Sequence, residues 1–186
     1  NNAGHVRVFE FSGSDWVQLG GDIDAEAEGD GSGWSVSLSS DGTIVAIGAL
    51  RNDGNGSESG HVRVYEYSGS DWSQIGSDID GEAEDDHACS VSMSSDGSKV
   101  AIGATNSDGN GENAGHVRVF EYSGGDWVQL GSDIDGEAEG DFSGYSVSMN
   151  SAGDRVAIGA RDNDGTGDNA GHVRVYEYSN SSWTQL

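Results

Sequence analysis

The sequence predicts an all-β protein of β-propeller type, made of tandem repeats that each carry four antiparallel strands. Three observations support this. A Gly-His-Val-Arg-Val segment begins at Gly4, Gly60, Gly115 and Gly171, so the repeats are 56, 55 and 56 residues apart. Apolar runs are short and rich in β-branched residues, and Gly-containing turns separate them in a chain with 31 Gly and no Pro. No segment shows the apolar period of a helix.

The first two strands of a repeat are clearest after Gly33. Residues 34–39 alternate apolar and small polar side chains, which is the pattern of a half-buried strand. Asp41-Gly42 follows, and this dipeptide between two strand-like runs indicates a hairpin. Residues 43–49 are apolar at nearly every position, so we expect a strand that is buried on both faces.

The second half of the repeat supplies two more strands and a connector. Residues 61–67 predict the third strand, with Val62 and Val64 on one face. Residues 72–75 predict a short fourth strand, and an acidic connector at 78–86 leads into the next repeat. Four antiparallel strands in a repeat of this length are typical of a propeller blade.

The repeats divide the chain into one array of about three and a half blades. Residues 1–32 hold the third and fourth strands and an acidic connector, 33–87 and 88–143 are repeats, and 144–186 is a repeat without its acidic connector. A closed propeller commonly has four to eight whole blades, so this segment alone is expected to leave an open edge. A longer chain, association of copies, and an open filament of blades are the three alternatives.

The charge balance limits the partners. The chain has 33 acidic residues against 8 Lys and Arg, a net charge of −25 with His neutral. Phosphate backbones and anionic membrane surfaces would repel it, so we expect no nucleic-acid partner. No apolar run is long enough for a membrane span, so we expect no membrane insertion. A divalent cation or a basic partner would be attracted.

Four segments resemble the FG-GAP repeat, in the branch whose blades carry a Trp-x-Gln strand. They are Gly-Tyr-Ser-Val-Ser at 144–148, Val-Ala-Ile-Gly-Ala at 156–160, Gly-His-Val-Arg-Val-Tyr at 171–176, and Trp-x-Gln-Leu at 183–186. Relatives include the blades of the integrin α-subunit propeller, and the resemblance covers essentially the whole chain. It implies an extracellular or cell-surface propeller that binds protein or glycan, and not an enzyme.

Two features depart from that family. Gly33-Trp34 and Ala88-Cys89 stand where the last repeat has Gly-Tyr. Calcium-binding blades of the family carry an Asp-rich loop between their first two strands, whereas the loops at 39–42, 94–97 and 150–153 hold one carboxylate or none. Calcium takes six to eight oxygens, so this site of the family does not carry over.

The acidic connectors supply the candidate metal ligands. If a connector is extended, its alternate carboxylates line one side, and Ca²⁺, the candidate cofactor, would relieve their repulsion. The alternative is a solvated acidic face that keeps the repeats soluble. The candidate ligands are Asp22, Asp24, Glu26, Asp78, Asp80, Glu82, Asp133, Asp135 and Glu137. A Gly-rich segment at 53–56 and its copies favour a plain turn.

Trp and Arg recur at fixed places in every repeat, so we expect structural roles for them. These positions are Trp16, Trp72, Trp127, Trp183, Arg7, Arg63, Arg118 and Arg174. Each Arg is expected to pair with a neighbouring acidic connector. The His two positions before each Arg lies on a separate blade, so the four His cannot share one metal.

No catalytic residue is predicted, because a catalytic site needs unlike residues that converge. Arg51, His87, Cys89 and Lys99 break the repeat symmetry but form no recognisable nucleophile–base set. Cys89 is expected to be a small buried hydrophobe, with a reactive thiol as the alternative. Asn-x-Ser triplets in predicted turns give the candidate glycosylation sites Asn55 and Asn180, which favour a secreted protein.

The sequence supports two alternative functions. The first is a non-enzymatic extracellular propeller for adhesion or ligand binding, assisted by Ca²⁺. The second is a structural repeat subunit that self-assembles into an extracellular filament or coat.

Overall fold

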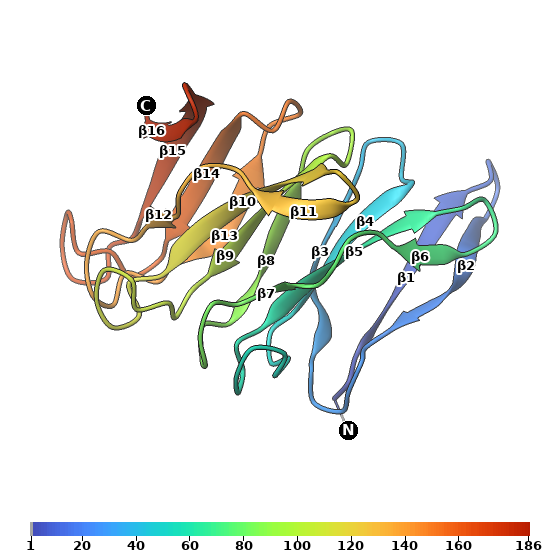
Figure 1. Ribbon diagram of the computed structural model, residues 1–186, viewed down its shortest axis with the longest axis horizontal. Coiled ribbons are helices and arrows are strands. Elements are labelled where there is room, and N and C mark those ends of the chain that lie inside the picture. The colour runs from blue at the N-terminus through green and yellow to red at the C-terminus, as the bar shows by residue number, and fades with distance from the viewer. Residues whose placement is uncertain (1) are drawn as a thin grey trace.

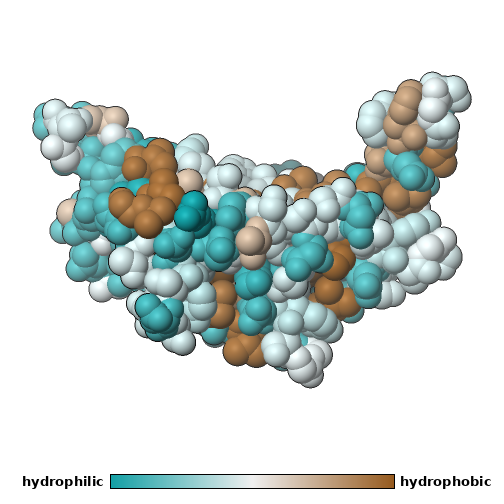
Figure 2. Space-filling view, turned by 90° about the horizontal axis from the view of Figure 1, so that it is seen from above, coloured by the Kyte–Doolittle hydropathy of each residue, from teal (hydrophilic) through white to brown (hydrophobic). Residues whose placement is uncertain are grey.

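The computed structural model describes residues 2–186, and within this range it contains sixteen strands and no helix, which confirms the all-β prediction. None of these residues therefore forms a helix capable of crossing a membrane. The four sheets stand side by side in chain order, from the β1–β2 hairpin at one end to β16 at the other (Figure 1). Figure 2 shows the resulting curved body, which is hollowed between two projecting arms.

Each sheet is an antiparallel meander in which consecutive strands are neighbours, joined mostly by Gly-containing turns and, between the second and third strands, by a longer Gly-rich loop. The partial blade holds β1 (His5–Phe11) and β2 (Trp16–Asp24). The next sheet holds β3 (Ser32–Leu38), β4 (Ile44–Ala49), β5 (His61–Tyr67) and β6 (Trp72–Gln74). The third holds β8 (Ala88–Met93), β9 (Lys99–Ala104), β10 (His116–Ser123) and β11 (Asp126–Gln129). The last holds β13 (Ser143–Met149), β14 (Arg155–Ala160), β15 (His172–Ser179) and β16 (Ser182–Gln185).

Two short strands belong to the connectors and were not predicted. β7 (Ile79–Asp80) pairs with β5, and β12 (Ile134–Asp135) pairs with β10. The isoleucine of each strand is buried, so the connector is fastened to its blade by one apolar side chain among the acids.

The core lies between neighbouring sheets. Val62 and Val64 of β5 pack with Ile102 of β9, and Val45 and Ile47 of β4 pack in a second cluster on the other side of the same sheet. β4 is buried on both faces, as predicted. Its small residues allow close approach, which Gly48 shows most clearly: a Cβ there would lie 2.0 Å from the carbonyl oxygen of Cys89 in the next blade.

The small polar residues of the first strand face the next blade. The hydroxyl of Ser35 accepts from the backbone N–H of Val91, and that of Ser37 accepts from Met93 N–H. The equivalent strand β8 is more deeply buried than β3, because β8 has a neighbouring inner strand on each side, β3 and β13. In β3 the same pattern leaves Val36 and Leu38 exposed.

The sequence predicts that the alternate carboxylates of each connector lie on one side. This prediction fails for the last carboxylate, because each connector turns before it reaches the next strand. The last carboxylate of each row, Asp30, Asp86 and Asp141, is buried. Each accepts a hydrogen bond from a backbone N–H of its own turn, as Asp86 does from Ala83. These three carboxylates therefore stabilise a turn.

Candidate functional site

The four equivalent arginines lie beside acidic connectors. Nη2 of Arg63, Arg118 and Arg174 donates to the backbone carbonyl oxygens of Asp24, Asp80 and Asp135, at 2.9, 2.6 and 2.9 Å. Nη1 of the same three lies 3.6, 3.5 and 3.6 Å from a carboxylate oxygen of Glu26, Glu82 and Glu137. In each case the connector belongs to the preceding blade, so the arginine joins two blades. Arg7 instead donates from Nε to Asp22 of its own connector at 3.2 Å.

The equivalent tryptophans join the same pairs of blades. Nε1 of Trp72, Trp127 and Trp183 donates to the carbonyl oxygens of Leu19, Ile75 and Leu130, at 2.7, 2.9 and 2.7 Å. Each acceptor follows the Trp-x-Gln segment of the preceding blade. Trp16 has no preceding blade in this structure, and its side chain is exposed.

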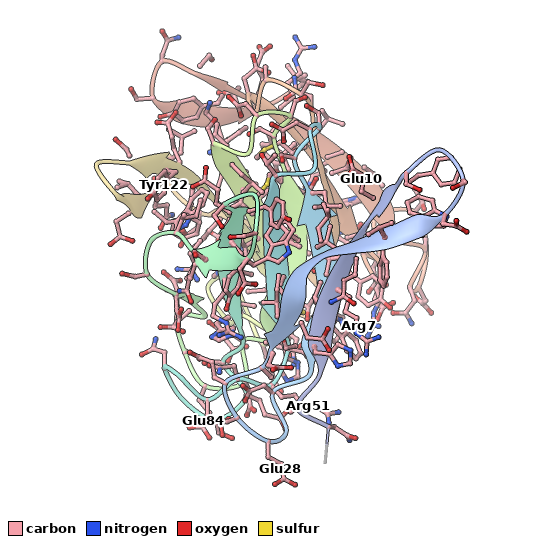
Figure 3. All side chains as sticks on the ribbon, turned by 90° about the vertical axis from the view of Figure 1, so that its right-hand side faces the viewer. Arg7, Glu10, Glu28, Arg51, Glu84 and Tyr122 are labelled. Atoms are coloured by element: carbon pink, nitrogen blue, oxygen red, sulfur yellow. The ribbon has the colours of Figure 1, made fainter. Side chains whose placement is uncertain are left out.

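The glutamine of the Trp-x-Gln segment positions the first acid of its connector. Nε2 of Gln18, Gln74 and Gln129 donates to Oδ1 of Asp22, Asp78 and Asp133, at 2.9, 2.6 and 2.6 Å. The glutamine therefore binds only Oδ1 of each aspartate, and the second carboxylate oxygen, Oδ2, is left for another contact. The connectors lie together at one end of the blades, where Glu28, Glu84 and Arg51 are labelled (Figure 3).

At that end the structure brings a histidine to the acids, which the sequence reasoning did not foresee. His61 is 1% exposed, and its Nδ1 lies 3.8 Å from Glu26 Oε2, 3.9 Å from Asp78 Oδ2 and 4.0 Å from Asp80 Oδ1. Burial lowers the pKa of His61 and Arg63 lowers it further, while the three acids oppose both effects. Burial raises the pKa of Asp80.

The next blade repeats this arrangement. Glu82, His116 and Asp133 each bring a ligand atom within 4.8 Å of the others, as Glu26, His61 and Asp78 do. Nδ1 of His116 shares a hydrogen bond of 2.9 Å with the hydroxyl of Ser107, and the buried Nε2 has no hydrogen-bond partner.

The last blade retains part of the set. His172 Nε2 lies 3.6 Å from Glu137 Oε2, and no aspartate of the described residues completes a set of three ligands around this histidine. The predicted metal ligands therefore divide between interfaces: each glutamate meets the histidine of the following blade, and each first aspartate meets the histidine of its own blade.

Calcium fits neither set of candidate sites well. In the hairpin loops the single carboxylates are occupied: Asp41 accepts from Ser39 and Thr43, and hydrogen bonds from Ser98 and Ser94 lower the pKa of Asp96 to about 2. At the connectors one oxygen of Asp78 is bound by Gln74, and a histidine nitrogen lies among the acids, whereas calcium takes six to eight oxygens.

The Gly-rich loops are turns. Oδ1 of Asp53, Asp108 and Asp164 accepts the backbone N–H of the residue five positions later, at 2.9, 2.8 and 2.7 Å. The predicted glycosylation site Asn55 lies in the first loop, where its Nδ2 donates to the carbonyls of Gly81 and Glu82. Asn180 lies exposed in the β15–β16 turn.

A second candidate site is a cavity of about 560 Å³ at the connector end, which we call the three-blade pocket. Its lining includes positions at which the repeats differ. One position gives Trp34, Cys89 and Tyr145, and another gives Leu50, Thr105 and Arg161. His87, Asn106 and Phe142 also line it. Unlike residues from three blades therefore converge on one cavity, which is what a binding site in a repeat protein requires.

The walls of the three-blade pocket are aromatic. The side chains of Trp34 and Tyr145 are both largely exposed, whereas Cys89 of the middle blade is buried. The guanidinium of Arg161 lies 4.6 Å from the ring centroid of Tyr145 and 4.7 Å from that of Phe142. Such stacking holds a cation and two rings in place.

His87 and Cys89 do not form a nucleophile and its base. Nε2 of His87 lies 3.1 Å from Glu58 Oε2, and Nδ1 lies 3.0 Å from Asn106 Nδ2, so both ring nitrogens are engaged. Burial raises the pKa of the Cys89 thiol to about 12, far above the pKa of an activated cysteine. The other two symmetry-breaking residues lie elsewhere: Lys99 pairs with Glu121 at 3.4 Å, and Arg51 lies outside the lining of this pocket.

Single-residue reasoning missed the pocket, although the signal is in the sequence. An alignment of the three repeats shows Leu50, Thr105 and Arg161 as unlike residues at one position, in a chain whose other polar residues mostly recur. The fold places that position next to the start of the first strand, where Trp34 and Tyr145 also differ from Cys89.

Solved structures with a similar fold include two proteins described as lactonases and the protein TolB. A protein described as a 6-phosphogluconolactonase from Bacteroides uniformis has a TM-score of 0.66 at 14% identity, over 99% of this chain and 47% of its own. The periplasmic gluconolactonase PpgL of Pseudomonas aeruginosa has a TM-score of 0.60 at 14% identity, over 100% and 52%. TolB from Acinetobacter baumannii has a TM-score of 0.53 at 13% identity, over 100% and 38%. The chain thus spans about half the length of the first two, and at these identities the likeness concerns the fold alone.

Sequence comparison identifies the repeats. No curated protein matches the chain. Residues 24–65 and 77–120 match the FG-GAP repeat, and both segments run from an acidic connector through the first three strands of a blade. The repeat period and the four-stranded sheets agree with these two matches, and the repeats that they cover belong to the FG-GAP repeat family.

Proposed function

We propose that this FG-GAP array acts as a non-enzymatic extracellular β-propeller that binds a glycan for adhesion. The convergence of unlike residues from three blades on the three-blade pocket carries the proposal. A volume of about 560 Å³ lies within the range of small-ligand sites. The extracellular location rests on the family and on the exposed triplet at Asn180.

The chemistry of the pocket favours a sugar. Trp34 and Tyr145 offer exposed aromatic faces, against which the apolar face of a pyranose ring can pack. Thr105 lines the same cavity and donates to Asn106 Oδ1 at 3.1 Å, so its hydroxyl oxygen can still accept a hydrogen bond from a sugar hydroxyl. Arg161 pairs with Asp162 through Nε at 3.2 Å, and its two Nη groups would favour a sugar that carries a carboxylate or sulfate.

Removal of the aromatic walls should abolish glycan binding. We expect Trp34→Ala and Tyr145→Ala each to lower the affinity for an acidic glycan at least tenfold on a glycan array followed by calorimetry, because each removes one packing face. Trp16→Ala is the matched control, since Trp16 is exposed and lies outside the pocket. Unchanged binding in both pocket variants would contradict the proposal, as would retention of only a protein ligand.

The non-enzymatic part of the proposal is supported by the engaged nitrogens of His87 and the raised pKa of Cys89. The lactonase neighbours carry no argument for hydrolysis here, because 14% identity conveys the fold and not the site. Divalent-cation assistance remains part of the proposal, with Ca²⁺ and an ion that also accepts a nitrogen ligand as the two candidates.

Self-assembly is the second candidate function, and the uncovered end faces favour it. Val173 of the last blade is 67% exposed, whereas the equivalent Val117 is 0% exposed because the next blade covers it. Phe9, Phe11 and Trp16 are exposed on the partial blade at the other end. Another blade, from a second copy or from further repeats of a longer chain, would cover these faces.

A charge on the last blade should weaken such assembly. We expect the chain to sediment as oligomers at high concentration and Val173→Asp to shift it towards monomers, because a carboxylate would have to be buried in the contact. Val128→Asp is the control, since Val128 is similarly exposed but lies on the outer strand β11. Monodisperse monomers of the parent chain at every concentration would exclude this candidate.

A further inference from the structure

Two buried histidines have a ring nitrogen without a partner. His61 and His116 are each 1% exposed, and neither Nδ1 of His61 nor Nε2 of His116 has a hydrogen bond. A buried polar atom without a partner costs about 1–3 kcal/mol, so native proteins seldom leave one unless something binds there. Such nitrogens at equivalent interfaces indicate a common purpose, and Nε2 of the less buried His172 also lacks a hydrogen bond.

The unpartnered nitrogen of His61 lies among carboxylates that are too distant for hydrogen bonds, and a ring nitrogen of His116 lies within 4.8 Å of carboxylate oxygens of Glu82 and Asp133. Nδ1 of His61 lies 3.8 to 4.0 Å from single oxygens of Glu26, Asp78 and Asp80. These distances leave the nitrogen and the oxygens facing one another around a shared centre. An ion with bonds of about 2.0–2.2 Å would hold its ligands roughly 3–3.6 Å apart, so side-chain shifts below ~1 Å would close the set.

The local charge also suits a divalent cation. Glu26, Asp78 and Asp80 bring three negative charges, and Arg63 brings one positive charge within 3.6 Å of Glu26. With His61 neutral, the sum is −3 + 1 = −2. The second interface has the same composition, with Glu82, Asp133, Asp135 and Arg118 at the equivalent repeat positions.

The ligand type points to a transition metal and away from calcium. Imidazole nitrogen is a ligand of zinc, copper, iron and nickel, whereas calcium selects oxygen alone. We propose that two blade interfaces each bind a divalent transition-metal ion such as Zn²⁺, through Glu26, His61 and Asp78 and through Glu82, His116 and Asp133. The inference does not depend on glycan binding, because the ligands lie outside the three-blade pocket.

Neighbouring residues orient these ligands as outer groups commonly do in metal sites. Gln74 and Gln129 hold Oδ1 of Asp78 and Asp133, which turns Oδ2 of Asp78 towards His61. Ser107 is bonded to Nδ1 of His116, and when that nitrogen carries the proton, the lone pair of Nε2 is free for a metal.

Two other histidines serve as internal comparisons. His172 meets Glu137, but the set lacks the aspartate of a following connector. His87 lies near Glu58 and Asp85, but hydrogen bonds already engage both of its nitrogens. We therefore expect two ions for each 186-residue chain.

Metal titration of the chelator-stripped chain tests the proposal. We expect calorimetry with Zn²⁺ to give a stoichiometry of two, and Co²⁺ to give visible absorption bands that Zn²⁺ abolishes. His61→Ala and His116→Ala should each lower the stoichiometry to one, and the double variant should lower it to zero. His172→Ala is the matched control and should leave it at two.

A second pair of variants distinguishes loss of a metal ligand from unfolding of the chain. Asp78→Asn and Asp133→Asn are isosteric and lie at partly exposed positions, so each should remove one ion while far-UV circular dichroism stays unchanged. Absence of Zn²⁺ binding by the folded parent chain would overturn the proposal. So would displacement of Co²⁺ by equimolar Ca²⁺, or a stoichiometry of two in the folded double histidine variant.

Discussion

Replacement of Gly103 by alanine is expected to destabilise the chain by about 3 kcal/mol. A Cβ at Gly103 would lie 2.1 Å from the carbonyl oxygen of Gly144 and 2.9 Å from its carbonyl carbon, both backbone atoms of the next blade. No side-chain rotation can relieve that overlap, so the two blades would have to separate along β9 and β13. Urea unfolding followed by tryptophan fluorescence measures the change in the free energy of unfolding.

Gly159→Ala is the matched control for this prediction. Gly159 holds the equivalent position in the last blade, but the nearest atom to its Cβ would be the hydroxyl oxygen of Ser146, which can rotate away. We expect a loss below ~1 kcal/mol for Gly159→Ala. Equal losses at the two positions would show that blade contact is not what requires glycine there.

Trp127→Ala is expected to cost about 3–5 kcal/mol, whereas Trp16→Ala should cost less than ~0.5 kcal/mol. Trp127 is 9% exposed, its ring lies 5.2 Å from that of Tyr122, and its Nε1 donates to Ile75 of the preceding blade. Trp16 holds the same repeat position but is 68% exposed. The pair therefore isolates the contribution of the neighbouring blade.

Trp127→Phe separates packing from the hydrogen bond. It keeps an aromatic ring against Tyr122 and removes the indole N–H, so the carbonyl of Ile75 loses its donor. We expect an intermediate loss of about 1–3 kcal/mol, which the same urea measurement would resolve. Similar losses for Trp127→Ala and Trp16→Ala would contradict the inter-blade role of the tryptophan.

The strands themselves could be predicted because their pattern is local. β5 has the predicted bounds, and β4 begins one residue later than predicted. What joins the blades is not local: the carbonyl that Trp127 binds lies 52 residues earlier, and the serine hydroxyl that receives the N–H of Met93 lies 56 residues earlier. A period shows that repeats exist, but it does not show which atoms of one repeat meet those of the next.

The candidate sites were harder to foresee for the same reason. In the sequence, His61 aligns with the other histidines, which lie on other blades. In the structure, its neighbours are acids from two connectors. The predicted acids are placed at the interfaces, but the nitrogen at their centre comes from a strand that reads as core. In the three-blade pocket, the bulge of the first strand holds two residues in β3 and in β13 but only Cys89 in β8, so a small side chain stands where the other repeats place Trp34 and Tyr145.

The tryptophan bonds have a mechanical consequence. Each one fastens the outer strand of a blade to the blade before it, and the three bonds are separated by a whole repeat along the chain. A pulling force applied at the two ends would therefore load a single blade at a time, and each rupture would release about 56 residues. Fully extended, such a length spans roughly 190 Å, so the array would lengthen in equal steps and dissipate mechanical energy at each step.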